Sequence, residues 1–224
     1  VIVGGQAGAR ITTNTNNTLM GYQAAAFNSA ASNSAFGYQA LLGVDGSSTG
    51  GSNAAFGYQA LFALTTGTLN FAAGYSAGAA VTSGNHNTLL GNSAGLRITT
   101  TSSSTHVGSG AALYNTGANN TSVGYQAMLG VDVTSTGGSN SALGYQSLYG
   151  LTTGTNNVAV GYQSLNAETT GANNVVIGYQ AGLLQNGASG NTIVGPSAAT
   201  ALTSSSNNVI VCLLYTSPSP RDQR

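Results

Sequence analysis

The tetrapeptide Gly-Tyr-Gln-Ala stands at residues 21–24, 37–40, 57–60, 124–127 and 178–181, and Gly-Tyr-Gln-Ser stands at 144–147 and 161–164. Weaker copies begin at Gly4, Gly74, Gly91, Gly108 and Gly195. From Gly4 onward, the spacings between successive glycines are 17, 16, 20, 17, 17, 17, 16, 20, 17, 17 and 17 residues. A period of this length is typical of a solenoid, in which each repeat forms one coil that stacks on its neighbours.

Fixed columns of residues surround the repeated glycine. Three residues after it stands Ala or Ser in every copy, and directly before it the residue is nearly always apolar. Four residues before it stands an asparagine, with Ser104 as the exception: Asn17, Asn33, Asn53, Asn70, Asn87, Asn120, Asn140, Asn157, Asn174 and Asn191. Stacking of equivalent residues predicts a structural asparagine ladder whose side-chain amides are linked along the axis.

The residue types favour β-structure over helix. Apolar residues do not recur at helical spacing, and each glycine would cost about 1 kcal/mol inside a helix. Turn formers such as Thr65-Thr66-Gly67-Thr68 separate the copies. We therefore predict an all-β fold, a parallel β-solenoid or β-roll of about 12 coils of 16–20 residues over residues 1–211. Each coil should hold two short strands, and the rod should be roughly 60 Å long at about 4.8 Å per coil.

A longer period lies on top of the first. Residues 41–68 and 128–155, which are 87 residues apart, are identical at 20 of 28 positions. The two 20-residue coils owe their extra length to the segments Gly43–Gly51 and Gly130–Gly138. We expect these segments to be loops on the same side of the rod, about 24 Å apart. Loops on a rigid scaffold commonly carry recognition, so the candidate recognition residues are Val44, Asp45, Val131 and Asp132.

The composition excludes several classes of function. Charged residues form 4% of the 224-residue chain, and the net charge is zero. Nucleic-acid binding depends on clustered Lys and Arg and is not expected. No apolar stretch approaches the roughly 20 residues of a membrane helix, so no membrane insertion of this segment is expected. A single Cys excludes a disulfide framework and a Cys-rich metal site.

Catalytic groups are equally scarce. His86 and His106 lie in different columns, and we expect both to be ordinary turn or face histidines. Asp45 and Asp132 should lie about 24 Å apart, too far for a catalytic carboxylate pair. Isolated carboxylates are also poor Ca²⁺ sites, since that ion takes six or more oxygens. We therefore predict that the chain is not an enzyme in this stretch and has no catalytic, cofactor-binding or metal-binding residues.

A tyrosine follows the glycine in eight copies: Tyr22, Tyr38, Tyr58, Tyr75, Tyr125, Tyr145, Tyr162 and Tyr179. One interpretation is a structural ladder of stacked rings within the rod or at a subunit seam. The other is an aromatic strip that recognises sugars or a receptor.

The last residues do not fit the repeat. The columns predict Gly at position 212, where Cys212 stands, and residues 212–224 match no column. Their sequence resembles the in-frame translation of a transposase adaptor used in sequencing libraries. We therefore expect 212–224 to be a non-native tail and 1–211 to be an internal fragment of a longer chain.

The columns carry a resemblance to known families. Asn157-Val158-Ala159-Val160-Gly161 and Asn174-Val175-Val176-Ile177-Gly178 resemble the head repeats of YadA-like trimeric autotransporter adhesins. The whole run of coils is similar to shaft repeats of phage and bacterial tail-fibre-type proteins. The resemblance implies a three-chain fibre on a virion tail or a bacterial surface that attaches to a glycan or protein receptor of a host cell.

The residue physics also favours association. The dependable large apolar residue of each coil is the one directly before the glycine, partly supported by a Leu, Met or Ala four residues after it. Such a core is thin against an ordering cost of about 1–2 kcal/mol per residue. A homotrimer would bury further faces. The alternative function is an ice-binding or other surface-binding monomeric β-solenoid, which would need a regular Thr column.

Overall fold

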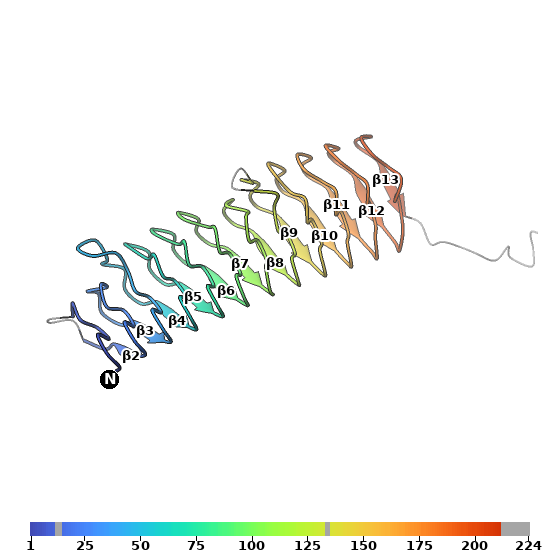
Figure 1. Ribbon diagram of the computed structural model, residues 1–224. Coiled ribbons are helices and arrows are strands. Elements are labelled where there is room, and N and C mark those ends of the chain that lie inside the picture. The colour runs from blue at the N-terminus through green and yellow to red at the C-terminus, as the bar shows by residue number, and fades with distance from the viewer. Residues whose placement is uncertain (12–14, 133–134, 212–224) are drawn as a thin grey trace, which may run out of the picture.

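The computed structural model describes residues 1–11, 15–132 and 135–211. One short strand from each coil joins a single parallel sheet of 13 strands, in sequence order along a straight rod (Figure 1). The predicted all-β parallel solenoid of about 12 coils is confirmed, and the described residues contain no helix. The strands are β1 (Ile2–Val3), β2 (Thr18–Met20), β3 (Ser34–Phe36), β4 (Ala54–Phe56), β5 (Phe71–Ala73), β6 (Thr88–Leu90), β7 (Thr105–Val107), β8 (Thr121–Val123), β9 (Ser141–Leu143), β10 (Val158–Val160), β11 (Val175–Ile177), β12 (Thr192–Val194) and β13 (Val209–Val211). The predicted non-native tail, 212–224, lies outside the described residues.

The strand register follows the repeat spacing. Thr88 of β6 pairs with Thr105 of β7, one 17-residue coil later. Where the sequence spacing changes to 16 or 20 residues the pairing changes with it, because Ser34 pairs with Thr18 on one side and with Ala54 on the other. Insertions are therefore absorbed outside the sheet, which keeps equivalent residues stacked.

The repeated glycine is required by both conformation and space. Gly57 has φ +128°, a region that side-chain-bearing residues rarely adopt. A Cβ atom placed there would lie 2.5 Å from the carbonyl oxygen of Gly74 in the next coil. The same close approach recurs along the rod, so the glycine column allows consecutive coils to stack at β-sheet spacing.

The prediction of two strands per coil is wrong. After the glycine, every second residue has a left-handed backbone, as at Gln59 (φ 52°) and Leu61 (φ 51°), so the chain turns instead of extending. Coils are still joined on this side, because the Gln59 amide donates to Tyr38 O at 2.9 Å and the Leu61 amide to Ala77 O at 3.0 Å. The solenoid thus has one sheet and, opposite it, a stack of hydrogen-bonded turns.

The core is formed by the middle residue of each strand and by residues three, four and seven after the glycine. Large and small side chains alternate between these columns. Ala55 faces the rod interior in the same coil as Leu61, whereas Leu89 lies in the same coil as Gly95. A Cβ atom on Gly95 would lie 2.8 Å from Leu89 Cδ2. Each coil therefore fills the narrow interior without a void.

The large apolar residue directly before the glycine does not belong to this core, contrary to our expectation. Side chains alternate along a strand, and the inward position is taken by the middle residue. The residue before the glycine consequently points away from the rod, with Phe56 37% and Leu143 50% exposed. We call this outward column, together with the first residue of each strand, the apolar face.

The interior is not apolar throughout. One buried apolar cluster runs from Leu19 to Ile98 and a second from Ala127 to Ala198. Between them the coil at Gly108 buries polar side chains, namely Ser104, His106, Asn115 and Ser122. The rod therefore consists of two apolar segments joined by a polar one.

Candidate functional site

The tyrosine column forms two ladders of stacked rings. Neighbouring centroids lie 4.9–5.6 Å apart with interplanar angles of 5–18°, in the series Tyr22, Tyr38, Tyr58, Tyr75 and in the series Tyr125, Tyr145, Tyr162, Tyr179. The gap falls at Asn92 and Ser109, which occupy the column in the two intervening coils. Within each ladder the ring faces contact one another, so it is mainly the ring edges that meet solvent.

A glutamine ladder runs beside the tyrosines. The Gln39 side-chain amide donates to the Gln23 side-chain oxygen at 2.8 Å, and Gln59 donates to Gln39 at 2.9 Å. The second segment repeats the arrangement, with Gln163 donating to Gln146 at 3.1 Å. Each coil is thereby joined to the next by a ring contact and an amide hydrogen bond, which supports the structural interpretation of the tyrosine column. Recognition by this column stays a prediction.

The asparagine ladder is buried and differs in detail from the expected amide-to-amide chain. The side-chain oxygen of Asn157 accepts the backbone amide of Asn174 at 3.0 Å, one coil away. Its side-chain nitrogen donates to Gly171 O at 2.8 Å. Each asparagine therefore holds backbone groups of the strand entry and of the turn, and direct amide-to-amide bonds, such as Asn174 to Asn157 at 2.9 Å, are added at some coils.

The predicted recognition loop around Val44 and Asp45 is exposed and anchored from below. The buried Ser48 hydroxyl accepts the Val44 amide at 2.6 Å and donates to Leu64 O at 2.8 Å in the following coil. Asp45 Oδ1 lies 2.5 Å from Arg10 Nη2, and both side chains are more than half exposed. The fixed base and the ion pair define where the tip of the loop lies.

The second predicted loop repeats the anchor. Val131 and Asp132 are exposed, the Val131 amide donates to Ser135 Oγ at 3.0 Å, and the Ser135 amide donates to Asp132 O at 3.1 Å. Apart from residues 133–134, which lie outside the described range, the loop occupies the same side of the rod as the loop at Gly43–Gly51 (Figure 1). The structure does not bring the four candidate residues into one site; it places two pairs on separate loops.

Sequence reasoning missed the arginine that joins the first loop. Arg10 precedes Asp45 by 35 residues, and Arg97 precedes Asp132 by the same 35 residues. The 87-residue period that relates the aspartates therefore also relates the arginines, and this spacing was the available signal. Two coils separate each arginine from its loop, a distance that only stacking makes short.

The remaining titratable groups do not gather into a catalytic set. His86 lies exposed in a turn, as expected. His106 instead occupies the buried core column, where its Nδ1 lies 2.9 Å from Ser122 Oγ and its Nε2 has no partner. Burial lowers the pKa of His106 from 6.5 to about 4, although a hydrogen bond to the Thr105 backbone opposes the shift. Glu168 is also fully buried, and backbone amides surround it.

Within residues 1–11, 15–132 and 135–211, no group of three or more His, Cys, Asp or Glu side chains is arranged to hold a metal ion. The same part of the chain contains no helix long and apolar enough to cross a membrane. Comparison with protein-family models, curated proteins and solved structures finds no match. The function is therefore argued from the rod's own surfaces.

Proposed function

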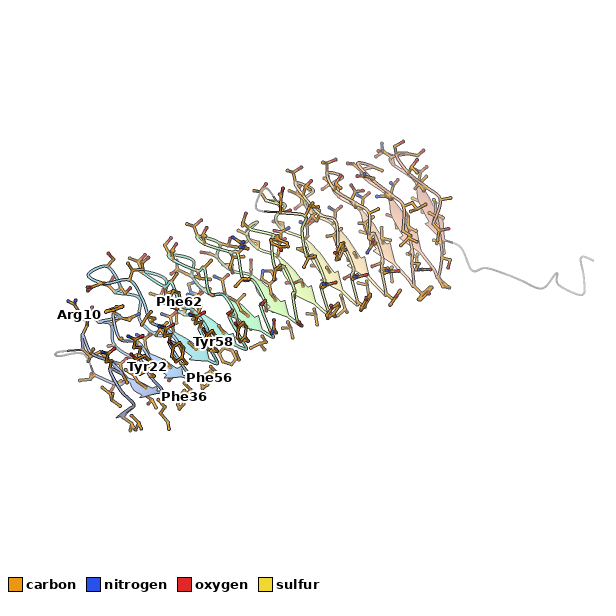
Figure 2. The ribbon with its side chains drawn as sticks, viewed as in Figure 1. Arg10, Tyr22, Phe36, Phe56, Tyr58 and Phe62 are labelled. Atoms are coloured by element: carbon orange, nitrogen blue, oxygen red, sulfur yellow. The ribbon has the colours of Figure 1, made fainter. Side chains whose placement is uncertain are left out.

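We propose that the chain is a rod segment of a homotrimeric attachment fibre, borne on a virion tail or a bacterial surface, that presents recognition loops to a host receptor. The observation that carries the proposal is the apolar face. It runs along the outer side of the whole 13-stranded sheet, and the stacked Phe36 and Phe56 rings, 5.0 Å apart, lie on it (Figure 2). The columns that form it contain no charged residue between Val3 and Val211.

The size of this face favours association. A strip about 60 Å long and three residues wide covers on the order of 600 Å², the upper limit of what monomeric proteins usually expose. Depletion of charge is characteristic of the buried centre of protein interfaces. The resemblance of the repeats to trimeric fibre proteins gives the number of chains. The loops lie away from this face, so they would remain accessible in the assembly.

Sedimentation equilibrium of the chain tests the proposal. We expect the mass of a trimer, because the outward column of one chain is covered by the same column of two others. Phe56→Glu combined with Leu143→Glu should convert the trimer into monomers, since each copy would bury two carboxylates near a symmetry axis. Leu184→Glu, on the loop side, is the matched control and should leave the trimer intact. A folded wild-type monomer or dimer contradicts the proposal.

The alternative, an ice-binding monomeric solenoid, requires a regular flat array of Thr. The first residue of the strands is Thr at 18, 88, 105, 121 and 192, but Ala54, Phe71, Val158 and Val175 interrupt that column. Thermal hysteresis of a monomeric rod would favour this alternative over the fibre. The proposal assigns no catalytic step to either form.

A further inference from the structure

A small cleft lies between the first long loop and the coil that contains Arg10. Its volume is about 290 Å³, and its lining residues are Arg10, Phe27, Ser29, Gly46, Ser48 and Thr49. Figure 2 shows Arg10 on the loop side of the rod, away from Phe36 and Phe56. The cleft therefore stays open when the apolar face is covered.

The chemistry of the cleft is mixed and close to neutral. The Arg10–Asp45 pair places guanidinium donors beside carboxylate acceptors, and the two charges offset each other. One guanidinium nitrogen faces Asp45, which leaves other N–H donors of the same group for a ligand. Phe27 adds a half-buried ring, and Ser29 and Thr49 add hydroxyls. A neutral, ring-shaped ligand with adjacent hydroxyl groups matches this set.

We propose that this cleft binds one sugar ring of a neutral glycan, an inference that rests on the proposed attachment function for the source of that glycan. Small-molecule sites usually measure about 300–1,000 Å³, so the cleft has room for a single ring and not for an oligosaccharide. Arg10 and Asp45 would bond neighbouring hydroxyls, while the apolar face of the sugar packs on Phe27.

The second long loop repeats the same residue types. Arg97, Tyr114, Thr116 and Asp132 stand 87 residues after Arg10, Phe27, Ser29 and Asp45. A cleft of about 350 Å³ lies there, lined by Ala80, Arg97, Thr99, Thr100 and Thr116. Of the five Arg, Asp and Glu residues in 1–211, four belong to these two sets and the fifth, Glu168, is buried. Charge is thus confined to the two clefts in an otherwise uncharged surface.

The spacing gives two sites about 24 Å apart on one chain. A shallow cleft binds a single sugar weakly, in the millimolar range for so few contacts. Two sites per chain, multiplied by the copies in a fibre, raise the effective affinity by orders of magnitude when a surface presents many identical glycans. Weak and repeated sites are consistent with attachment to a densely glycosylated surface.

Saturation-transfer difference NMR of the chain with methyl glycosides of glucose, galactose, mannose and N-acetylglucosamine tests the inference. We expect a saturable signal with millimolar Kd for at least one glycoside. Arg10→Gln or Asp45→Asn should reduce the signal by about half, because one of two sites is lost. Arg10→Gln combined with Arg97→Gln should reduce it at least tenfold. Both arginines are exposed, and thermal melting of each variant checks that the rod remains folded.

Leu184→Ala is the matched control, because Leu184 occupies the same column as Arg10 and Arg97 in a coil without a long loop. It should leave the signal unchanged. No saturable signal, a signal that survives the double arginine change, or a response to methyl glucuronide alone overturns the inference. Sedimentation of the same samples separates the two proposals, since a trimer that binds no glycoside contradicts only the cleft, and a monomer that binds one contradicts only the fibre.

Discussion

Glu168 shows how one side chain can replace a missing backbone group. In the preceding coil, Leu151 occupies the equivalent position, and the amides of Thr152 and Thr153 donate to Thr169 O in the next coil at 2.9 and 3.1 Å. One coil later, Glu168 Oε1 instead accepts the amides of the following turn, including Gly171 at 2.6 Å, and the amide of Gly187 at 2.7 Å. The carboxylate therefore does the work of a carbonyl because the peptide at Gly187 presents its N–H.

Glu168→Leu should lower the free energy of unfolding by about 3 kcal/mol or more, because several buried amides lose their acceptor. Urea denaturation measures the change. Adding Gly187→Thr should recover part of the loss, since a side chain disfavours the left-handed backbone at that position and turns a carbonyl toward the amides. A cost below 1 kcal/mol for Glu168→Leu would show that water satisfies these amides.

At the level of the coil, the asparagine column sets the stability of each junction. Asn87 donates to Thr101 O at 2.7 Å and accepts the Ser104 amide at 3.1 Å, so it holds both ends of a coil. Ser104 is too short to reach in the same way, and its hydroxyl accepts the Asn120 amide at only 3.3 Å. The junction at Ser104 is therefore weaker than the junctions on either side.

Asn157→Ala and Ser104→Asn should change stability in opposite directions. The first leaves the Asn174 amide and Gly171 O buried without partners, at a cost of about 2–4 kcal/mol. The second completes the ladder and should add about 1 kcal/mol. Both are measured as shifts in the urea midpoint, and an equal effect of the two changes would contradict a role for the ladder.

At the scale of the whole rod, every stabilising column is interrupted in the same place. The tyrosine ladder, the glutamine ladder, the asparagine ladder and the apolar core all break near the coil at Gly108, where His106 and Ser122 occupy the core. Stability in a solenoid depends on contacts between neighbouring coils. We expect this coil to exchange its amide hydrogens faster than the coils of either flanking segment.

His106 should make that junction sensitive to pH. Its pKa in the folded chain is about 4, below the ordinary value of 6.5, so the unfolded chain binds the extra proton first as the pH falls. Stability is therefore complete above pH 6.5 and is lost as the pH falls toward 4. The free energy of unfolding should decrease by about 2 kcal/mol between pH 7 and pH 5.

His106→Leu combined with Ser122→Ala is the control for this effect, since it matches the apolar side chains of the same column in other coils. Its stability should be nearly constant over that pH interval. A wild-type chain as insensitive to pH as this variant would show that His106 is not the group responsible.

The fold could be predicted from the sequence because stacking converts spacing directly into register. The 16- and 20-residue intervals around Ser34 reappear as strand pairings without correction. What could not be predicted was direction, because the period does not say which of two adjacent apolar residues in a three-residue strand faces inward. Ala55 is buried and Phe56 is exposed, although size alone would reverse them.

The candidate loops could be predicted for a related reason, since the insertions that form them must leave the stack. Their partner Arg10 could not be identified from local motifs, because it lies two coils away from Asp45 in sequence and beside it in space. His106 was misjudged because one polar residue in an apolar column gives no periodic signal.

The 87-residue unit begins and ends in the same register, and this has a consequence for inheritance. Unequal recombination between two copies of its gene would insert or delete a whole unit and leave every remaining coil able to pair with its new neighbour. Each gain would lengthen the rod by about 24 Å and add one loop and one arginine together. Reach and number of sites would thus change in fixed steps, without any new side chain having to be selected.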